Sequence, residues 1–258
     1  MGSLIACVIL SGRTLAPLGQ VSNLLGRFNQ AVTAYENFGQ LMQQPVKELG
    51  RTHQVRVDKV EGAIFIVNAS LTYPEQKEAV VKQLNLQLYA GEKIAIVGKI
   101  GSGKTSILRL IAGLYDPSEG SIKIDNHDIS HMHPDDVRQH IGVVMQVPML
   151  FSGTLKENLL MGNPDATDEQ MIAAAKIANV DEIASNLPDG YETVLAEGGK
   201  QLSGGQRQAI CIARAFVGDP KIIIMDEPSS AMDSGSEQQL LKDLQVRLAD
   251  KTLILITH

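Results

Sequence analysis

The sequence has no tryptophan, few aromatic residues and few cysteines. Only 4% of its 258 residues are aromatic, which argues against the stacking platforms that bind single-stranded nucleic acids. It also lacks an excess of positive charge: the net charge is −6 and the pI is about 5.5, so we expect no nucleic-acid partner. Its two cysteines, Cys7 and Cys211, lie far apart in apolar surroundings. They therefore indicate neither a disulfide framework nor a metal site, and they fit a reducing compartment.

The remaining composition is close to that of a soluble globular protein, with 44% apolar and 20% charged residues. It excludes a collagen, a disordered acidic tail and a multi-pass membrane protein. The length predicts one large domain or two small ones.

Near its start the chain has an unbroken apolar run from Leu4 to Leu10. A helix that spans a membrane needs about 20 such residues, so this run is too short. It does not match a signal peptide either, because no basic residue precedes it and no small-residue cleavage site is obvious. Two interpretations stay open: a buried helix of a soluble protein, or the end of a membrane helix whose upstream part is missing.

A helical pattern follows over residues 18–42. Apolar side chains recur there at steps of three or four residues, which is the spacing of one helix face; they are Leu18, Val21, Leu25, Phe28, Val32, Tyr35, Phe38 and Met42. Because proline cannot continue a helix, Pro45 is expected to follow its end. We expect residues 1–48 to form one segment, 49–60 a polar linker and 61–258 a second domain.

The second region alternates short apolar strands with helical stretches. The expected strands are Ala63–Val67, Leu84–Tyr89, Ile94–Val97, Ile122–Ile124, Ile141–Met145, Ile222–Met225 and Thr252–Ile256. The expected helices are Lys104–Ala112, Asp168–Ala178, Gly204–Val217 and Ser236–Leu248. Strands that are followed by helices predict a mostly parallel sheet with covered faces, whereas the two earliest strands are expected to pair antiparallel. The expected fold class is α/β.

One loop in this region matches a phosphate-binding motif. The strand Ile94–Val97 runs into Gly-Lys-Ile-Gly-Ser-Gly-Lys-Thr and then a helix, as the pattern G-x-x-x-x-G-K-[ST] requires. Its glycines let backbone N–H groups curl around phosphates, and the helix N-terminus adds partial positive charge. We expect Lys104 to reach the β- and γ-phosphates and Thr105 to ligate Mg²⁺; the alternative is an ordinary glycine-rich turn. The candidate nucleotide-binding residues are Gly98, Gly101, Ser102, Gly103, Lys104, Thr105 and Ser106.

A second motif is an apolar strand that ends in two carboxylates. The four apolar residues Ile222–Met225 predict a buried central strand. Asp226, at the carboxyl end of that strand, would lie beside the phosphate loop, where Mg²⁺ binds. Glu227 is then placed to polarise a water molecule against the γ-phosphate. Taken alone, the two acids would fit an ordinary turn before Pro228 equally well.

The segment that opens the helix Gly204–Val217 reads Leu-Ser-Gly-Gly-Gln, from Leu202 to Gln206. Ser203 and Gln206 fit a capping box, so a structural explanation exists. Two consecutive glycines, however, cost up to about 1 kcal/mol each in a helix, and they make more sense where backbone approaches a ligand. Together with both phosphate motifs, this segment resembles the signature of the ABC ATPases. The resemblance covers Glu61 to His258.

The resemblance implies roles for the matching residues. In that family the signature of one subunit contacts the γ-phosphate of an ATP that the phosphate loop of the other subunit holds, in a head-to-tail dimer. A homodimer is therefore implied, in which the signature acts in trans through Ser203, Gly204, Gly205 and Gln206. ATP and Mg²⁺ are the implied cofactors. The implied fold is a P-loop NTPase with a parallel-sheet core, an antiparallel β subdomain and a helical signature subdomain.

Other matches are single residues. Gln146 matches the Q-loop glutamine, which senses Mg²⁺ and the contact with the membrane domain, and Tyr73 matches the aromatic residue that stacks on adenine. Taken in isolation, Tyr73 would be an ordinary tyrosine at a strand end. Ser230–Asp233 matches the D-loop, and His258 matches the switch histidine that contacts the γ-phosphate. The resemblance thus implies catalytic roles for Glu227, His258 and Gln146, and metal binding by Thr105, Gln146 and Asp226.

Further segments resemble exporters within this family. Thr193–Gly199 resembles the acidic X-loop, with Glu197 as coupling residue, and Phe151–Asn158 resembles the segment on which the membrane domain docks. The apolar run and the long helix resemble the end of the last membrane helix and its cytoplasmic extension. Residues 10–20 resemble the type I secretion ATPases of Gram-negative bacteria. Those proteins work with a membrane-fusion adaptor and an outer-membrane channel, and they export large unfolded proteins such as RTX toxins or adhesins.

The resemblance therefore implies an ATPase on the cytoplasmic side of a bacterial inner membrane that works with its own transmembrane domain to export a protein. An exporter of lipids or small molecules is the first alternative. A soluble ABC ATPase that acts on DNA or ribosomes is a more distant one, and a binding module without hydrolysis is disfavoured by Glu227. Because the family fold usually continues past the switch histidine, the sequence is expected to be truncated at both ends.

Overall fold

The computed structural model describes residues 2–43, 55–74, 76–99, 101–230, 232, 235, 244 and 247–257. The chain divides into two compact units, Met1–Thr52 and His53–His258. Each unit is described by itself below.

The first unit is built on one long helix, α1 (Gly2–Met42). The prediction that the helical pattern begins at Leu18 was too short, because α1 also takes in the apolar run and continues through Pro17. Proline in a helix removes one backbone hydrogen bond. In the turns before Pro17, the hydroxyls of Ser11 and Thr14 donate to backbone carbonyl oxygens at 2.9 to 3.1 Å. Both hydroxyl groups therefore find hydrogen-bond partners within the helix itself.

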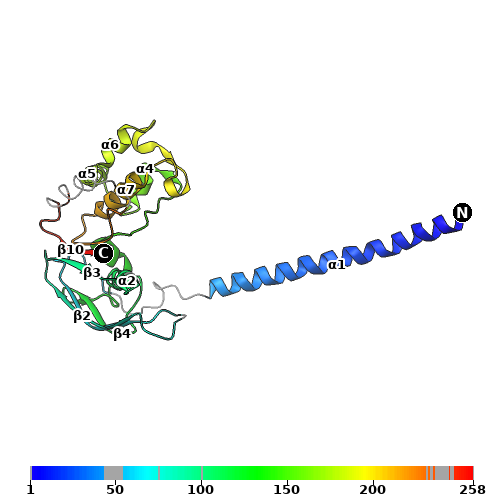
Figure 1. Ribbon diagram of the computed structural model, residues 1–258, viewed down its shortest axis with the longest axis horizontal. Coiled ribbons are helices and arrows are strands. Elements are labelled where there is room, and N and C mark those ends of the chain that lie inside the picture. Colours follow the sequence, from blue (N-terminus) through cyan, green and yellow to red (C-terminus); the bar gives the residue numbers. More distant parts are fainter. Residues whose placement is uncertain are drawn as a thin grey trace. The chain divides into compact units, whose positions relative to one another are not determined.

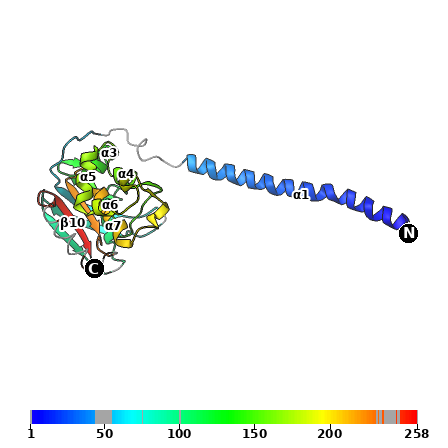
Figure 2. The ribbon, with the colours of Figure 1, turned by 90° about the horizontal axis from the view of Figure 1, so that it is seen from above.

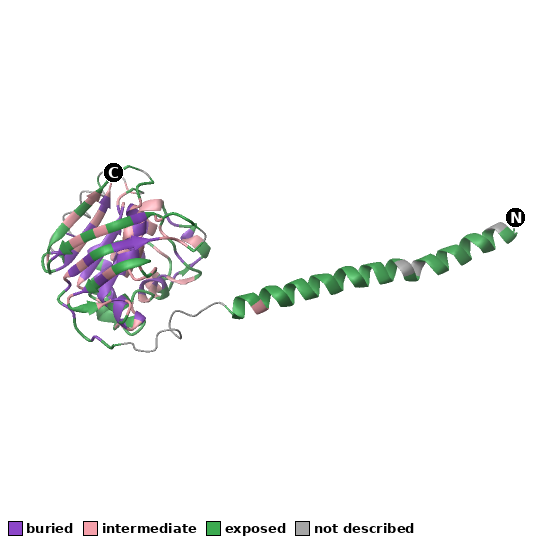
Figure 3. Cartoon of the chain, turned by 90° about the horizontal axis from the view of Figure 1, so that it is seen from below, coloured by how far each residue is buried: buried purple, intermediate pink, exposed green. Residues whose placement is uncertain are grey.

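The apolar side chains of α1 that the structure describes are exposed within their own unit (Figure 3). Val8, Phe28 and Tyr35, for example, are 63%, 64% and 78% exposed. The alternative of a buried helix in a soluble protein therefore finds no support in this unit. By length and composition alone, the stretch Ile5–Met42 could cross a membrane.

The described strands of the second unit form three sheets, and several of these strands are labelled in Figure 1. A parallel sheet has the order β3-β10-β9-β6, an antiparallel sheet has the order β2-β1-β4-β5, and a short ribbon pairs β7 with β8. The strands are β1 (Ile64–Leu71), β2 (Val81–Leu88), β3 (Lys93–Val97), β4 (Glu119–Ile124), β5 (His127–Asp128), β6 (Ile141–Val144), β7 (Gly153–Thr154), β8 (Val194–Leu195), β9 (Ile222–Asp226) and β10 (Thr252–Thr257). Both the parallel late strands and the antiparallel early pair confirm the prediction.

Strand β9 is the inner strand that the apolar run predicted. All five of its residues are buried, and it pairs in parallel with β10 on one side and β6 on the other. Asp226 stands opposite Ile256 at the carboxyl end of the sheet. Because β3 is the other neighbour of β10, the loop after β3 begins at the same edge of the sheet.

The helices that the structure describes over their full length in this unit are α2 (Lys104–Ile111), α3 (Pro134–His140), α4 (Leu155–Leu160), α5 (Asp168–Ile177), α6 (Val180–Ser185) and α7 (Gly204–Phe216). Helices α4 to α7 gather at one end of the unit, and the antiparallel sheet lies at the other (Figure 1), so that these helices lie in front when the unit is seen from above (Figure 2). Three helices match their predicted ranges within one residue, whereas α3, α4 and α6 are short and were not predicted. The helix expected over 236–248 lies largely outside the described residues.

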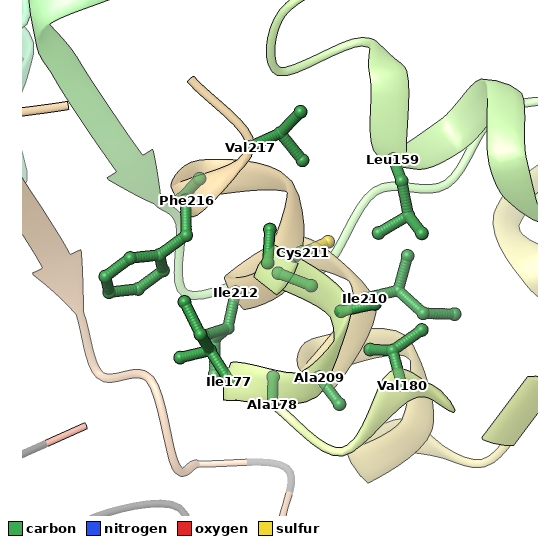
Figure 4. Packing of buried hydrophobic residues seen from close by; sticks show 14 of the residues in the cluster. Leu159, Ile177, Ala178, Val180, Ala209, Ile210, Cys211, Ile212, Phe216 and Val217 are labelled. Carbon is green, nitrogen blue, oxygen red and sulfur yellow. The ribbon is translucent and has the colours of Figure 1, made fainter. Parts of the chain in front are cut away.

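A single apolar cluster joins α4 to α7. Figure 4 shows side chains from α4, α5 and α6 converging on α7, among them Leu159, Ile177, Val180, Ala209, Ile210 and Ile212. Burial of this kind contributes roughly 25 cal/mol per Å² of apolar surface. The cluster therefore makes the helix that carries the Leu-Ser-Gly-Gly-Gln segment part of a packed helical layer.

The second half of the expected linker is packed onto α3. Val57 is 6% exposed, its N–H donates to Asp136 at 2.8 Å, and its carbonyl oxygen lies 2.9 Å from Nε2 of His140. Arg56 adds an ion pair with Asp136 at 2.8 Å. Burial alone would raise the pKa of Asp136, but the hydrogen bonds from Val57 and Arg56 and the Arg56 charge outweigh it and lower the pKa.

Candidate functional site

A pocket of about 420 Å³ lies at the carboxyl edge of the parallel sheet. Segments far apart in the sequence meet there: the end of β1, the loop after β3, the start of α2, and the residues that follow β6 and β9. The lining residues are Tyr73, Gln76, Val80, Gly101, Ser102, Gly103, Lys104, Thr105, Ser106, Arg109, Gln146, Asp226 and Glu227. The structure thus brings together most of the residues that were singled out in the sequence.

The loop after β3 has the backbone that its glycines allow. Gly101 and Gly103 have φ of 81° and 90°, in the region that side chains disfavour. Gly103 is the N-cap of α2, and a Cβ atom there would stand 3.2 Å from the carbonyl oxygen of Val80. The first residues of α2 line the pocket, so the N-terminus of the helix lies beside it. No acidic residue in the first turn of α2 offsets the partial positive charge there.

Lys104 begins α2 and is 8% exposed. Its Nζ donates to the carbonyl oxygens of Gly98 and Lys99, at 2.6 and 3.1 Å. Gly98 was predicted to belong to the site but does not itself line the pocket. Its carbonyl oxygen instead holds the Lys104 side chain in place. The ammonium group therefore lies inside the loop, where a phosphate group would meet it.

Thr105 and Asp226 form the candidate magnesium site. The Thr105 hydroxyl donates to Oδ2 of Asp226 at 2.8 Å, and Asp226 is 2% exposed at the end of β9. Within the described part of the chain, no group of three or more His, Cys, Asp or Glu side chains could hold a metal ion by itself. Mg²⁺ commonly binds one or two carboxylates plus substrate phosphates and keeps several water molecules, so one hydroxyl and one carboxylate beside a phosphate loop fit this ion.

Glu227 and Gln146 are in direct contact at the wall of the pocket. Nε2 of Gln146 donates to Oε2 of Glu227 at 2.8 Å, which joins the residues that follow β6 and β9. Glu227 has φ of 45°, a costly conformation for a residue with a side chain. It is held by a 3.0 Å hydrogen bond from its N–H to the Ile256 carbonyl oxygen of β10. Strain of this kind at a pocket wall is typical of a functional position.

Tyr73 lies at the other end of the pocket, where its hydroxyl donates to Ser106 Oγ at 3.0 Å. Arg109 donates to the same hydroxyl at 3.2 Å, and the ring packs edge-on against Tyr115 at 4.9 Å between centroids. These contacts fix the tyrosine in the pocket wall. Arg109 was not predicted, although a signal existed: it lies three and four residues after Ser106 and Thr105, so a helix places these residues close together.

The Leu-Ser-Gly-Gly-Gln segment lies elsewhere. Ser203 and Gln206 form the predicted capping box of α7 through bonds of 2.9 and 3.2 Å, and Ser203 is exposed. None of the four predicted signature residues, all of which are described, lines the pocket of its own chain. Ala231 and Asp233 of the expected D-loop, and the candidate catalytic residue His258, lie outside the described residues.

The two segments that were compared with exporters pair with each other. Gly153 and Thr154 of β7 pair antiparallel with Val194 and Leu195 of β8. Glu197 follows on a short 3₁₀ turn, Glu197–Gly199, and is exposed. Large apolar side chains are exposed around this ribbon: Val147, Met149, Phe151 and Val194 are 69%, 64%, 46% and 67% exposed.

The comparisons with known proteins agree with this geometry. A family model described as ABC transporter matches residues 81–230. Over its full length the chain is 36% identical to the leukotoxin translocation ATP-binding protein LktB of Mannheimia glucosida. It is 35% identical to the leukotoxin export ATP-binding protein LtxB of Aggregatibacter actinomycetemcomitans. The chain spans 36% of the length of each of these relatives.

A solved structure of a bacterial Atm1-family ABC exporter with ATP bound superposes with a TM-score of 0.78 at 31% identity, covering 89% of this chain and 40% of that one. The fold and the pocket define a P-loop nucleotide-binding domain. The chain belongs to the ABC transporter family.

Proposed function

We propose that the chain binds and hydrolyses ATP and is the energy-supplying part of an exporter that secretes a protein. One observation carries the proposal. A single pocket joins the phosphate loop, the Thr105–Asp226 pair at 2.8 Å and the Gln146–Glu227 pair at 2.8 Å. That is the set of groups needed to hold a nucleoside triphosphate and to direct a water molecule at its last phosphate.

In this proposal each side chain of the pocket has a separate role. Lys104 and the N-terminal N–H groups of α2 bind the β- and γ-phosphates. Thr105, Gln146 and Asp226 hold Mg²⁺, which when bound neutralises charge on the phosphate oxygens. Glu227 accepts a proton from the attacking water, and Gln146 orients the Glu227 carboxylate through their hydrogen bond. Tyr73 stacks on the base, and His258 contributes at the γ-phosphate.

The site is completed by a second copy of the chain. The signature residues do not line their own chain's pocket, and Ser203 is exposed, which supports a head-to-tail homodimer in which Ser203, Gly204, Gly205 and Gln206 close the pocket of the partner. Two ATP molecules would then hold the dimer together, and hydrolysis would release it. The D-loop residues from Ser230 to Asp233 would lie between the two sites.

Coupling to export would run through the ribbon β7–β8. The exposed apolar side chains of Val194 and of the loop that precedes the ribbon, together with Glu197, are suited to contact a transmembrane domain of the same protein. The names of LktB and LtxB refer to leukotoxin translocation and export, which supports a protein as the exported substrate. A membrane-fusion adaptor and an outer-membrane channel would be further partners, with the nucleotide-binding domain on the cytoplasmic side of the inner membrane.

Two experiments test the proposal. Phosphate release from ATP by the 258-residue chain, compared with Lys104→Ala, tests hydrolysis; equal rates would contradict it. A second experiment tests the substrate class. This chain replaces the matching part of a leukotoxin exporter, and the same replacement with Lys104→Ala is the matched control. Secretion above that of the control supports protein export. Active ATPase without secretion would favour the alternative of a lipid or small-molecule exporter.

A further inference from the structure

The loop Met149–Phe151 is fastened to the signature helix by one arginine. Arg214 of α7 donates from Nη1 to the carbonyl oxygen of Met149 at 3.0 Å. Its Nε and Nη2 donate to the backbone oxygen and Oδ1 of Asn158, at 2.8 and 3.1 Å. The guanidinium carbon lies 5.9 Å from the centre of the Phe151 ring. A planar guanidinium can meet all these partners at once, which the single ammonium of lysine cannot do.

Asn158 fastens the same loop from α4. It is 1% exposed, its Nδ2 donates to the carbonyl oxygens of Phe151 and Thr154 at 2.9 and 3.0 Å, and its Oδ1 accepts from the Phe151 N–H at 2.9 Å. A buried amide with every contact made favours one geometry, because each lost contact leaves a polar group unpaired. Arg214 and Asn158 therefore hold the loop as one unit with α4 and α7.

This loop connects the pocket with the signature. Gln146, three residues before Met149, bonds the candidate base Glu227. On the other side, the Leu150 carbonyl oxygen accepts from the Gly198 N–H at 3.0 Å. Gly198 in turn accepts from Arg207, at the start of α7 beside the signature, at 3.3 Å.

We propose that Arg214 is a positioning residue that locks the loop Met149–Phe151 to helix α7, so that Gln146 and the signature move together. The inference rests on the proposed ATPase function and names a residue that acts on catalysis without touching the nucleotide. Arg214 does not line the nucleotide pocket. Its loss is therefore expected to lower the turnover of ATP and to leave ATP binding by the phosphate loop in place.

The test uses the 258-residue chain with Arg214→Gln, Arg214→Lys and a stability control. The control is Ala174→Gly in α5, a residue that is 2% exposed in the same helical layer. The measurements are the dissociation constant of ATP, kcat of phosphate release, Tm, and hydrogen exchange at the Phe151 and Gly198 amides.

We expect Arg214→Gln to lower kcat at least tenfold with less than a twofold change in the ATP dissociation constant, and to speed exchange of both amides at least tenfold. Arg214→Lys should recover part of kcat, and Ala174→Gly should lower Tm with kcat within twofold of wild type. Unchanged exchange in Arg214→Gln, or a loss of kcat equal to that of Ala174→Gly at the same Tm, would overturn the inference. A wild-type chain that releases no phosphate would instead overturn the proposed function, and the exchange measurement would still test the loop.

Discussion

Glu227→Gln is the substitution that separates binding from chemistry in the proposed site. The amide has the shape of the carboxylate and keeps an oxygen that can accept from Nε2 of Gln146. In the wild-type chain this nitrogen lies 2.8 Å from Oε2 of Glu227. The backbone hydrogen bond to Ile256 is also retained. The change therefore removes the basicity of Glu227 and little else, so folding and ATP affinity should stay close to wild type.

The size of the effect follows from the role of a general base. Such a group contributes about 10²- to 10⁴-fold to the rate, which corresponds to roughly 2.7–5.4 kcal/mol in activation free energy at 1.36 kcal/mol per tenfold. Single-turnover phosphate release should fall by this factor, and ATP should hold a longer-lived dimer that gel filtration detects. Glu182→Gln, an exposed acid in the first turn of α6, is the matched control. Release within threefold of wild type in Glu227→Gln would refute the assignment.

Three further outcomes follow from the structure. Lys104→Ala should raise the dissociation constant of ATP at least tenfold, because it removes a charge-assisted contact worth roughly 1.5–3 kcal/mol; calorimetric titration checks this, and unchanged affinity would contradict it. Gly103→Ala should lower the unfolding free energy by about 1–2 kcal/mol, because φ is 90° and the added Cβ stands 3.2 Å from the Val80 carbonyl oxygen; thermal unfolding measures it, and an unchanged Tm would argue against the loop geometry. Asp136→Asn should lower the free energy of unfolding by about 1–3 kcal/mol at pH 7, because it weakens the contacts of Asp136 with Arg56 and the Val57 N–H. Since the pKa of Asp136 is lowered from 3.8, this difference should hold above about pH 4 and vanish as the pH falls through the folded-state pKa. Urea unfolding against pH tests it, and a difference that persists at the acid end would be contrary evidence.

The phosphate loop and β9 were predictable because their signals are local. A glycine-rich loop between a strand and a helix is typical of phosphate binding. An unbroken apolar strand such as Ile222–Met225 is typical of the buried centre of a sheet. The capping box of Ser203 and Gln206 was predictable for the same reason, since both partners lie within one turn.

Other features depend on residues far apart in the sequence. The left-handed backbone of Glu227 is stabilised by Ile256 of β10, and the Tyr73 hydroxyl is fixed by Ser106 and Arg109 of α2, so neither could be read from neighbouring residues. Helix α1 was predicted too short because the apolar run Leu4–Leu10 and the helical pattern from Leu18 onward were interpreted as separate segments, whereas α1 continues through a proline, Pro17. An exposed helix allows it, since the carbonyl oxygen that loses its N–H partner can bind solvent.

In the proposed function, two chains hydrolyse Mg²⁺-bound ATP at their shared pockets. Its most direct test is the rate of phosphate release per chain as the concentration of the 258-residue chain is increased, with Mg²⁺ and with EDTA in its place. We expect release only with Mg²⁺ and a rate per chain that rises with concentration until dimers form. No release at any concentration would contradict the ATPase, and a constant rate per chain from the lowest concentration upward would contradict a site that needs the signature of a second copy.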